Sequence, residues 1–585
     1  MEEVFHFYLH SKTITFHKSL SLKQSTVDDP KSGYGLFIDP SKFSDEELNN
    51  ETVQLLRIPK HYTFNINTLL TVLEDKNEFS SLEQCQRTSD KIKTILREIM
   101  AYPGFSKFLT ETNLLITYFM IFQTIHDNYE IPGSIEYYLK NVLMNIEVET
   151  AIDSIENLAK DYGHYPQIFG LQETSSLFKD LFQEHLDASD IKHLYSAIIS
   201  RCLEIPEKSD TEDYEFSVQS TLVPILDFAN HENAQKNAYF DVDPSSNDVL
   251  LLLNTDAIRG ESSKPIEVFI SYMPTEDLLP MLITYGFIPD FRESPQFWTI
   301  SFDRGFLRDF TGLDLNANLR LFYKWLRINP VISLVKYKHN GQTRWFINDT
   351  AQEFSSLLLP FIPPLDSAKI ARWTYDPTCH LMFTKMHCLV NPETNEHAAL
   401  VAENYNSLIE ERELNGDDLI DLPPLAWSLH YKDAGGACLR QRHVDCAEAT
   451  SILQHELEQD TKKTKFRFVS FFRNFLKYRK ARITKLASNS SIARLLLEQE
   501  QEVIDDLAAA IDSNSTIFFS DLNMALNMEP NKFPPLRFHN DHKETNKNKD
   551  KLVPYLEDPA SYSPDRFTDF FQDEVNQYAA FFRDG

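Results

Sequence analysis

Glycine is scarce in this chain, with only 15 among 585 residues. No Gly-x-Gly-x-x-Gly follows an expected strand, and neither Gly-x-x-x-x-Gly-Lys nor Gly-x-Ser-x-Gly occurs. Phosphate-cradling loops and the nucleophile elbow of hydrolases need these glycines, because the backbone must turn sharply or approach a ligand closely there. The scarcity argues against Rossmann-type nucleotide binding, P-loop chemistry and the α/β-hydrolase mechanism.

Cysteine and long apolar runs are also scarce. Six cysteines scattered over 585 residues indicate reduced thiols rather than a disulfide framework. The best apolar run, Leu114–Phe122, is far shorter than a membrane span and predicts a buried helix, so no membrane association is expected. The acidic start Met-Glu-Glu-Val-Phe has the pattern of neither a secretory signal nor a mitochondrial presequence. These features predict a cytosolic protein.

Positive charge is in deficit, with 57 basic against 87 acidic residues and a net charge of −30. Nucleic-acid binding requires a basic surface, so no nucleic-acid partner is expected. An acidic surface speeds encounter with basic proteins, although solubility alone would also explain the charge.

The pattern of elements alternates along the chain. Hydrophobic residues make up 42% and aromatic residues 12%, which is enough for a sizeable core. Short apolar runs broken by turn residues predict strands near the N-terminus and again before residue 300, with helical spacing between them and after about 310. The expected divisions are a β domain in two parts (1–75 and 200–305), a helical insertion (76–199), a helical C-terminal domain (306–538), a linker (539–552) and an acidic aromatic tail (553–585).

Three polar motifs follow apolar runs within the second β part. The run Pro224–His231 ends in Asp, Asn and His, and Ile270–Tyr272 and Thr284–Phe287 follow within 60 residues. Buried polar groups must be hydrogen-bonded, so such side chains hold each other or a ligand. A strand that ends in a polar turn would give the same local pattern.

The order of these motifs is more specific than any one of them. Gly33-Tyr-Gly35-Leu-Phe-Ile, Leu55-Leu-Arg-Ile-Pro59, Ser200-Arg201, Asp227-Phe-Ala-Asn230-His231, Tyr272 and Tyr285-Gly-Phe287 occur in that order. The series resembles the SET-domain protein lysine methyltransferases, in particular the subclass typified by the plant Rubisco large-subunit methyltransferase. The resemblance implies an α+β fold: a β-rich SET domain with a helical insertion (iSET), followed by a mostly α-helical C-terminal substrate-binding domain.

The resemblance also implies a cofactor and a set of site residues. S-adenosylmethionine would be the methyl donor, Tyr285 the catalytic tyrosine, and Trp298 an aromatic wall of the lysine channel. The donor would be held by Ser32, Gly33, Tyr34, Gly35, Asn230, His231 and Tyr285, and the channel shaped by Ser200, Arg201, Asp227, Tyr272 and Trp298. Ser32 stands where relatives often have an acid. The alternative of a different class is a catalytically inactive SET-like module that binds a basic protein.

An acidic stretch lies between two of these motifs. It contains six acids and one lysine, and we expect it to form a negative rim at the mouth of the lysine channel, although a solvated loop would look the same. The acids are Glu204, Glu207, Asp210, Glu212, Asp213 and Glu215.

A lysine-rich basic protein is therefore the expected substrate. The length, the divergent N-terminus and the acidity resemble the fungal enzymes that trimethylate one lysine of cytochrome c in the cytosol, so cytochrome c is the first choice. Relatives that methylate an elongation factor or ribosomal proteins also act on basic proteins, so charge alone does not separate these substrates.

Two further patterns have competing interpretations. Thr461–Lys485 holds ten basic residues, no acid and six interleaved aromatics. It could bind a nucleic acid, an anionic membrane or a calmodulin-like partner, but an amphipathic helix packed in the C-terminal domain is favoured. The pairs Cys379-His380 and His387-Cys388 lack the spacing of a zinc knuckle, so no metal site is predicted.

Overall fold

The structure is a computed structural model that describes most of the N-terminal half and selected elements beyond it. The described residues are 2–9, 13–26, 33–102, 105, 110–163, 165–208, 216–259, 264–273, 276–291, 296–302, 306, 331–339, 342–347, 381–390, 397–399, 425–432, 439–444, 461–483 and 491–514.

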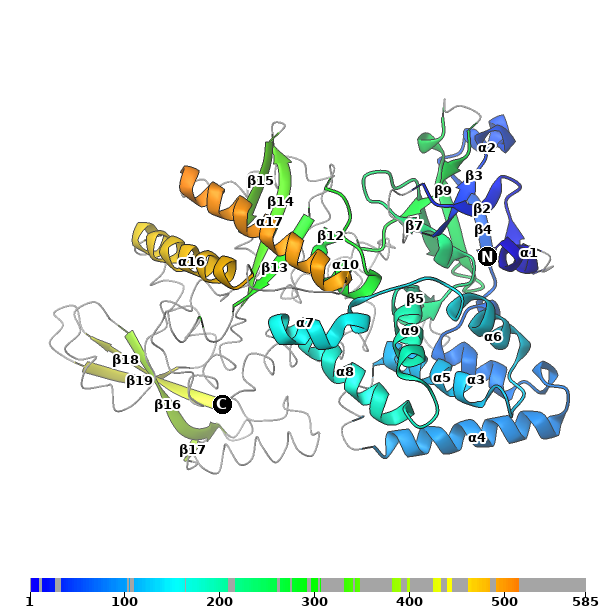
Figure 1. Ribbon diagram of the computed structural model, residues 1–585, viewed down its shortest axis with the longest axis horizontal. Coiled ribbons are helices and arrows are strands. Elements are labelled where there is room, and N and C mark those ends of the chain that lie inside the picture. The colour runs from blue at the N-terminus through cyan, green and yellow to red at the C-terminus, as the bar shows by residue number, and fades with distance from the viewer. Residues whose placement is uncertain are drawn as a thin grey trace.

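Two small antiparallel sheets form the N-terminal part, and helix α1 (Glu2–Leu9) lies beside them (Figure 1). One sheet has the order β1-β4-β9-β8 and the other the order β10-β3-β2. Each sheet combines strands from the first and from the second β part, so residues before 60 pair with residues after 238. Their bounds are β1 Thr15–Phe16, β2 Leu20–Gln24, β3 Tyr34–Ile38, β4 Thr52–Ile58, β8 Ala238–Val242, β9 Val249–Asn254 and β10 Ile266–Glu267.

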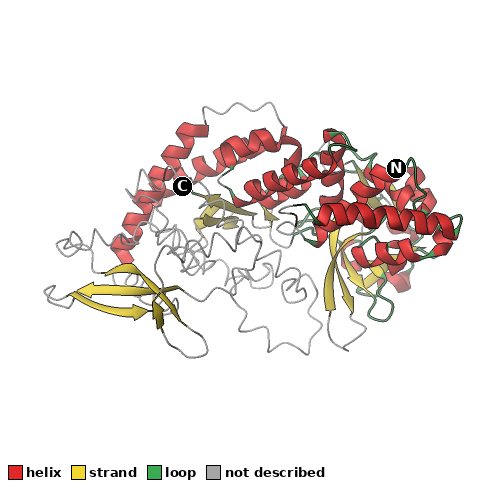
Figure 2. Ribbon diagram, turned by 90° about the horizontal axis from the view of Figure 1, so that it is seen from below, coloured by secondary structure: helices red, strands yellow, loops and turns green. Residues whose placement is uncertain are grey.

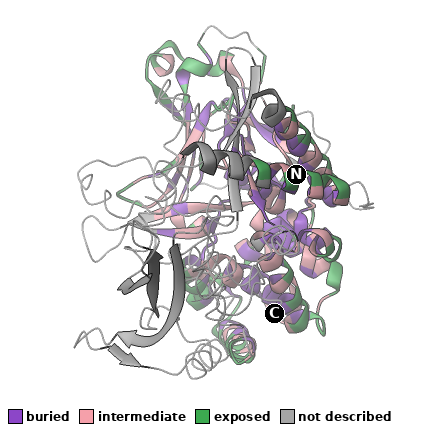
Figure 3. Cartoon of the chain, turned by 90° about the vertical axis from the view of Figure 1, so that its left-hand side faces the viewer, coloured by how far each residue is buried: buried purple, intermediate pink, exposed green. Residues whose placement is uncertain are grey.

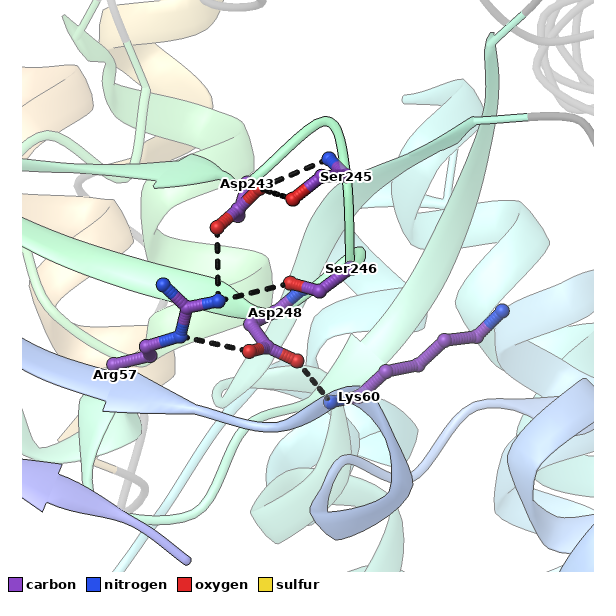
Figure 4. Close-up of polar contacts among 6 residues, drawn as sticks. All are labelled: Arg57, Lys60, Asp243, Ser245, Ser246 and Asp248. Carbon is purple, nitrogen blue, oxygen red and sulfur yellow. Dashed lines mark hydrogen bonds and ion pairs between the residues drawn. The ribbon is translucent and has the colours of Figure 1, made fainter.

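The apolar runs Ala238–Val242 and Val249–Leu253 flank a stretch of turn residues, which predicts a hairpin, and the structure confirms it as β8 and β9. Alternate residues of β9 are buried, as expected of a strand with one face on the core, and Asn247 takes a positive φ of 56° in the turn. Arg57 of β4 holds this turn: its guanidinium lies 2.8 Å from Asp243 and 2.8 Å from Asp248 and donates to Ser246 Oγ at 3.1 Å (Figure 4). Arg57 thereby fixes the turn against β4.

Helices occupy residues 66–199 almost entirely, as the sequence predicts. In Figure 2 the helices of the N-terminal half lie on one side and its strands on the other. Helix α5 is apolar on all sides, and its residues from 115 to 122 are all buried, so it forms the centre of this helical layer. The bounds are α3 Ile66–Glu74, α4 Leu82–Met100, α5 Glu111–Ile125, α6 Gly133–Tyr138, α7 Ile155–Tyr162, α8 Pro166–Phe182 and α9 Ala188–Ile199; the four-residue helix α2 (Asp45–Leu48) precedes them.

Short strands return after α9 and lead into one helix. The apolar run Glu267–Tyr272 predicts a single strand, but the structure has two, β10 and β11, interrupted at Val268. Strands β5 and β6 pair with each other, and β7 pairs in parallel with β11. The bounds are β5 Cys202–Lys208, β6 Phe216–Leu222, β7 Asn230–His231, β11 Phe269–Ile270, β12 Glu276–Asp277 and α10 Leu278–Tyr285.

The C-terminal half is not as helical as expected where the structure describes it. Strands form a sheet in the order β12-β13-β14-β15 and another in the order β17-β16-β18-β19. Only the last two described elements, α16 and α17, match the helical prediction, while the linker and the acidic tail lie outside the described residues. The bounds are β13 Gln296–Ser301, β14 Val331–His339, β15 Gln342–Ile347, β16 Leu381–Val390, β17 His397–Ala399, β18 Leu425–Lys432, β19 Leu439–Val444, α16 Thr461–Ile483 and α17 Ser491–Asn514.

The basic-aromatic segment is helix α16, and Phe472 and Phe475, two of its described rings, are buried. Phe475 packs edge-on against Phe302 with ring centroids 4.7 Å apart, while its neighbours Lys477 and Lys480 are exposed. This confirms the amphipathic helix. In Figure 3 the buried residues, drawn in purple, lie mostly where strands and helices pack against one another.

A buried ion pair joins α16 to α17. The Arg479 guanidinium donates to both carboxyl oxygens of Glu500, at 2.9 and 2.8 Å, and both side chains are almost fully buried. The guanidinium also lies 5.6 Å from the ring centre of Tyr162, at the end of α7 in the helical insertion. The C-terminal helices therefore pack directly on the insertion.

Candidate active site

Parallel pairing of β7 with β11 brings together motifs that are 40 residues apart. Asn230 lies opposite Phe269 and His231 opposite Ile270, so Tyr272 follows directly beside His231. The N–H of Tyr272 donates to Nδ1 of His231 at 3.0 Å, and its hydroxyl donates to the Ala229 carbonyl at 2.9 Å. These two hydrogen bonds fix the Tyr272 side chain against the Asn-His strand.

Four rings form an aromatic cluster at this point. The ring centroids of His231 and Tyr272 are 5.2 Å apart, and those of Tyr272 and Tyr285 are 4.7 Å apart. Phe287 closes the cluster at 6.2 Å from His231 and 6.3 Å from Tyr285. The structure thus gathers three of the predicted motifs, and we call these four residues the aromatic cluster. Phe287 belongs to a motif from the sequence, although no role was predicted for it.

Helix α10 delivers Tyr285 to the cluster. Asp277 caps its start by accepting a hydrogen bond from the Leu279 N–H at 3.3 Å, and Gly286 ends it in the left-handed conformation with a φ of 79°. Burial, reinforced by Tyr272 and by the negative charge of Glu204, raises the pKa of Tyr285 above its ordinary value of 10.0. Burial likewise raises the pKa of Tyr272 to about 12. Both hydroxyls are therefore protonated at neutral pH and act as hydrogen-bonding groups rather than bases.

His231 is held in one tautomer by its surroundings. Because Nδ1 accepts a hydrogen bond from a backbone N–H, the proton of the neutral ring must sit on Nε2. Nε2 is buried and has no hydrogen-bond partner among the residues that the structure describes; the nearest acid, Glu276 Oε1, is 3.7 Å away. This leaves one polar atom at the cluster for a ligand or a water.

Arg201 and Asp227 contact each other beneath the cluster. Arg201 Nη1 donates to the Asp227 backbone carbonyl at 2.9 Å and lies 3.5 Å from its carboxyl, with its guanidinium 4.9 Å from the ring centre of Phe228. Tyr138, at the end of α6, donates its hydroxyl to the same carboxyl. Burial raises the pKa of Asp227 despite the opposing effect of Arg201. This network ties the helical insertion to the segment that carries Asn230.

Tyr138 was not predicted from the sequence. It stands in Glu136-Tyr-Tyr138 on a helix of the insertion, about 90 positions before its partner, and nothing in that local pattern indicates a polar contact. The segment that receives it is itself strained: Ile225 is fully buried with a φ of 73°, which a β-branched residue rarely adopts.

The side-chain amide of Asn230 is hydrogen-bonded to the neighbouring strands. Its side-chain N–H donates to Glu267 Oε1 at 2.8 Å and to the Tyr34 carbonyl at 3.4 Å. Gly33 has a φ of 57°, which favours glycine, and a Cβ at Gly35 would collide with Glu267 and Asn230. The structure therefore brings the Gly33–Gly35 and Asn230-His231 motifs together through a glutamate that the sequence analysis did not select.

The remaining predicted site residues lie outside the aromatic cluster or outside the described part of the chain. Trp298 is fully buried in β13, opposite Leu334 of β14, and is not one of the rings of the aromatic cluster. Ser200 caps the end of α9 and its Oγ donates to the Ala197 carbonyl at 3.5 Å. Glu204 lies on β5, as does Glu207, whose side chain is not described. Ser32, Asp210, Glu212, Asp213 and Glu215 lie outside the described residues.

Two kinds of feature are absent from the described part of the chain. No group of three or more His, Cys, Asp or Glu side chains is placed to hold a metal ion. No described helix has both the length and the apolar character needed to cross a membrane.

Known proteins match the chain over its length. The fold and the site define an α+β protein with an aromatic site. A family profile described as cytochrome c lysine N-methyltransferase 1 matches residues 1–550. A relative of that name from Saccharomyces cerevisiae is 67% identical over 584 residues, covering 100% of both chains. Relatives of the same name are 34% identical in Eremothecium gossypii (61% of this chain and 73% of the relative) and 28% identical in Candida glabrata (87% and 92%).

The chain belongs to the cytochrome c lysine N-methyltransferase 1 family. The resemblance inferred from the sequence motifs is confirmed at the level of this family.

Proposed function

We propose that this protein is an S-adenosylmethionine-dependent protein-lysine N-methyltransferase that trimethylates one lysine of cytochrome c. Membership of the family over the whole chain supports the activity and the substrate. The observation that carries the proposal in the structure is the aromatic cluster, in which Tyr285 lies 4.7 Å from Tyr272, centroid to centroid, beside the Asn230-His231 strand. Such a site suits cationic groups better than it suits acid–base hydrolysis.

The proposed fold is a SET domain interrupted by a helical insertion. The two β parts, 1–75 and 200–305, pair with each other across the insertion through β4–β9 and β3–β10. Helices α4–α9 are the proposed insertion, and the part from 306 to 538 is the proposed substrate-binding domain. The contact between β parts distant in sequence supports this division.

The donor would supply a methyl group on a sulfonium cation. The residues that would hold the donor are those around Gly33, Tyr34 and Asn230. The backbone of His231 and the side chain of Tyr285 complete this set. Nε2 of His231 has no hydrogen-bond partner among the described residues, which leaves a polar atom for a ligand there and supports the assignment.

The substrate lysine must lose its proton before it can attack. Its ordinary pKa is about 10.4, and an apolar, aromatic surrounding disfavours the charged form. Tyr285 stays protonated because its pKa is raised, so it orients the amine rather than taking its proton. The ring faces of Tyr272 and Tyr285 stabilise cationic groups by about 0.5–2 kcal/mol per contact. Alignment of the attacking nitrogen accounts for the remaining acceleration.

Glu204 supports the proposed acidic rim. It lies on β5 opposite Ser220, close enough to Tyr285 for its charge to raise the tyrosine's pKa. Glu204→Gln should raise the KM for cytochrome c and flatten its dependence on salt, because one attractive charge at the channel is lost. Unchanged kinetics at low ionic strength would argue against the rim.

Methyl transfer to purified cytochrome c tests the proposed function. With labelled donor, the wild-type protein should give a trimethylated lysine that mass spectrometry detects. The variants Tyr285→Phe and Asn230→Ala should transfer little or no methyl group. Tyr102→Phe is the matched control, since the hydroxyl of this tyrosine donates to the exposed Asp180 at 3.1 Å, away from the aromatic cluster. Tight cytochrome c binding without transfer would support the inactive module instead.

The cellular setting can be tested in the same way. We propose that the protein acts in the cytosol, before cytochrome c enters mitochondria. Cytochrome c from a strain that lacks this protein should be unmethylated. Normal methylation there, with a methylated elongation factor or ribosomal protein missing, would move the proposal to that substrate.

A further inference from the structure

Glu267 is a buried acid at the junction of the two predicted donor-binding motifs. It lies on β10, which pairs with β3 so that Glu267 stands opposite Phe37, two residues beyond Gly35. Only 3% of the residue is exposed. A buried carboxyl is costly unless donors surround it, so its partners show what it holds in place.

Four hydrogen bonds converge on the Glu267 carboxyl. Oε1 accepts from Asn230 Nδ2 at 2.8 Å and from Ser25 Oγ at 2.7 Å. Oε2 accepts from the Thr26 N–H at 2.7 Å and from Thr26 Oγ1 at 2.5 Å. The carboxyl therefore joins the Asn230 strand to the two residues that directly follow β2.

Gly35 provides the space for this carboxyl. A Cβ at this position would lie less than 3.0 Å from both Glu267 Oε1 and Asn230 Nδ2, closer than real Cβ atoms approach other atoms. The glycine, the glutamate and the asparagine thus form one interlocked unit. The side-chain amide of Asn230 has one orientation in which it satisfies Glu267 and the Tyr34 carbonyl together.

We propose that Glu267 is a positioning residue for methyl-donor binding that acts through Asn230, while Ser25 and Thr26 hold its carboxyl in place. This inference rests on the proposed function, because the donor must occupy the Asn230 side of the site. Glu267 does not touch the donor: its oxygens are already shared among four protein donors. Its contribution is to fix the Asn230 amide before the donor arrives, which lowers the ordering cost of binding.

The substitution Glu267→Gln tests this role with little change of shape. An amide keeps one acceptor oxygen but turns the other into an N–H₂ donor, which must face two of the four donors. We expect the Kd of S-adenosylhomocysteine, measured by calorimetry on the full chain, to rise about tenfold or more, with the KM for cytochrome c unchanged within about twofold. Ser25→Ala, which removes one hydrogen bond, should raise that Kd about threefold and serves if Glu267→Gln does not fold.

A double-mutant cycle separates positioning from general destabilisation. If Glu267 acts through Asn230, Glu267→Gln combined with Asn230→Ala should bind the donor analogue little worse than Asn230→Ala alone. Glu500→Gln is the matched control, because Glu500 is equally buried, at 3%, but is bonded to Arg479 far along the chain. It should lower the melting temperature and leave the Kd unchanged.

The outcomes are distinct. Donor affinity within twofold of wild type in folded Glu267→Gln overturns the inference, as do fully multiplicative effects in the cycle or an equal loss of affinity in Glu500→Gln. If Asn230→Ala itself binds the analogue normally, the donor does not lie at Asn230. The proposed donor site then fails, and this inference with it.

Discussion

Gly286→Ala is the most direct test of how Tyr285 is held. Gly286 has a φ of 79°, and an L-residue in that region costs about 1–2 kcal/mol. A Cβ there would also lie less than 3.0 Å from the carbonyl oxygen of Glu149, a backbone atom of the helical insertion that cannot swing away. Relieving such overpacking costs about 1–3 kcal/mol more. We therefore expect the free energy of unfolding to fall by about 2–5 kcal/mol.

The activity should fall more than the stability alone explains. The variant must separate Gly286 from Glu149, and Tyr285 moves with its neighbour, which disturbs an alignment on which transfer depends steeply. We expect kcat to drop at least about tenfold at a temperature where the variant is still folded. Urea unfolding and methyl transfer to cytochrome c measure the two effects.

Gly133→Ala is the matched control. Gly133 begins α6, and a Cβ there meets nothing within 4 Å. Alanine is the better helix former, so stability should stay the same or rise by up to about 1 kcal/mol. If Gly286→Ala were as stable and as active as Gly133→Ala, the reasoning about the turn after Tyr285 would be refuted.

Three further predictions concern charged groups. The pKa of Asp277 is raised from 3.8 to about 7 by burial, so the folded state binds the extra proton between these values and stability falls as pH rises from about 4 to 7. Asp277→Asn keeps the helix cap and should flatten this pH dependence of the free energy of unfolding in urea, which amounts to up to about 4 kcal/mol; an unchanged slope would contradict the prediction. Arg479→Met should cost about 3–5 kcal/mol in urea unfolding because Glu500 is left buried and unpaired, whereas Arg479→Met combined with Glu500→Met should recover most of the loss. Arg57→Ala should lower the melting temperature slightly at low salt and not at 1 M salt, and a salt-independent loss would show that its packing dominates.

The sequence predicted the order of elements well where local patterns are long. The helical spacing of residues 92–100 and 114–124 lies within α4 and α5, and the turn between Val242 and Val249 gave the correct hairpin. Between 331 and 444 the prediction of helices was wrong for the described elements. Short apolar runs such as Leu381–Val390 fit a strand or a buried helix equally well, and the choice depends on strand partners far away in the chain.

The candidate site was predictable in its motifs and not in its contacts. The family pattern led to Asn230, His231, Tyr272 and Tyr285, and the structure places these four side by side. Glu267 was missed because an acid inside an apolar strand is locally indistinguishable from an exposed one. Its meaning comes from donors about 37 and 240 positions away.

The packing of α17 has a consequence for the order in which this protein matures on the ribosome. Ser491 donates to the Glu149 carboxyl at 2.5 Å, and the side chain of Ile492 lies beside Gly286, so the turn that follows Tyr285 is covered by residues translated about 200 positions later. At roughly 5–20 residues per second, about 10–40 s separate the two events. During that interval the nascent chain carries Tyr285 without the helix that covers the turn after it, so the N-terminal half cannot reach its final form before α17 has been made.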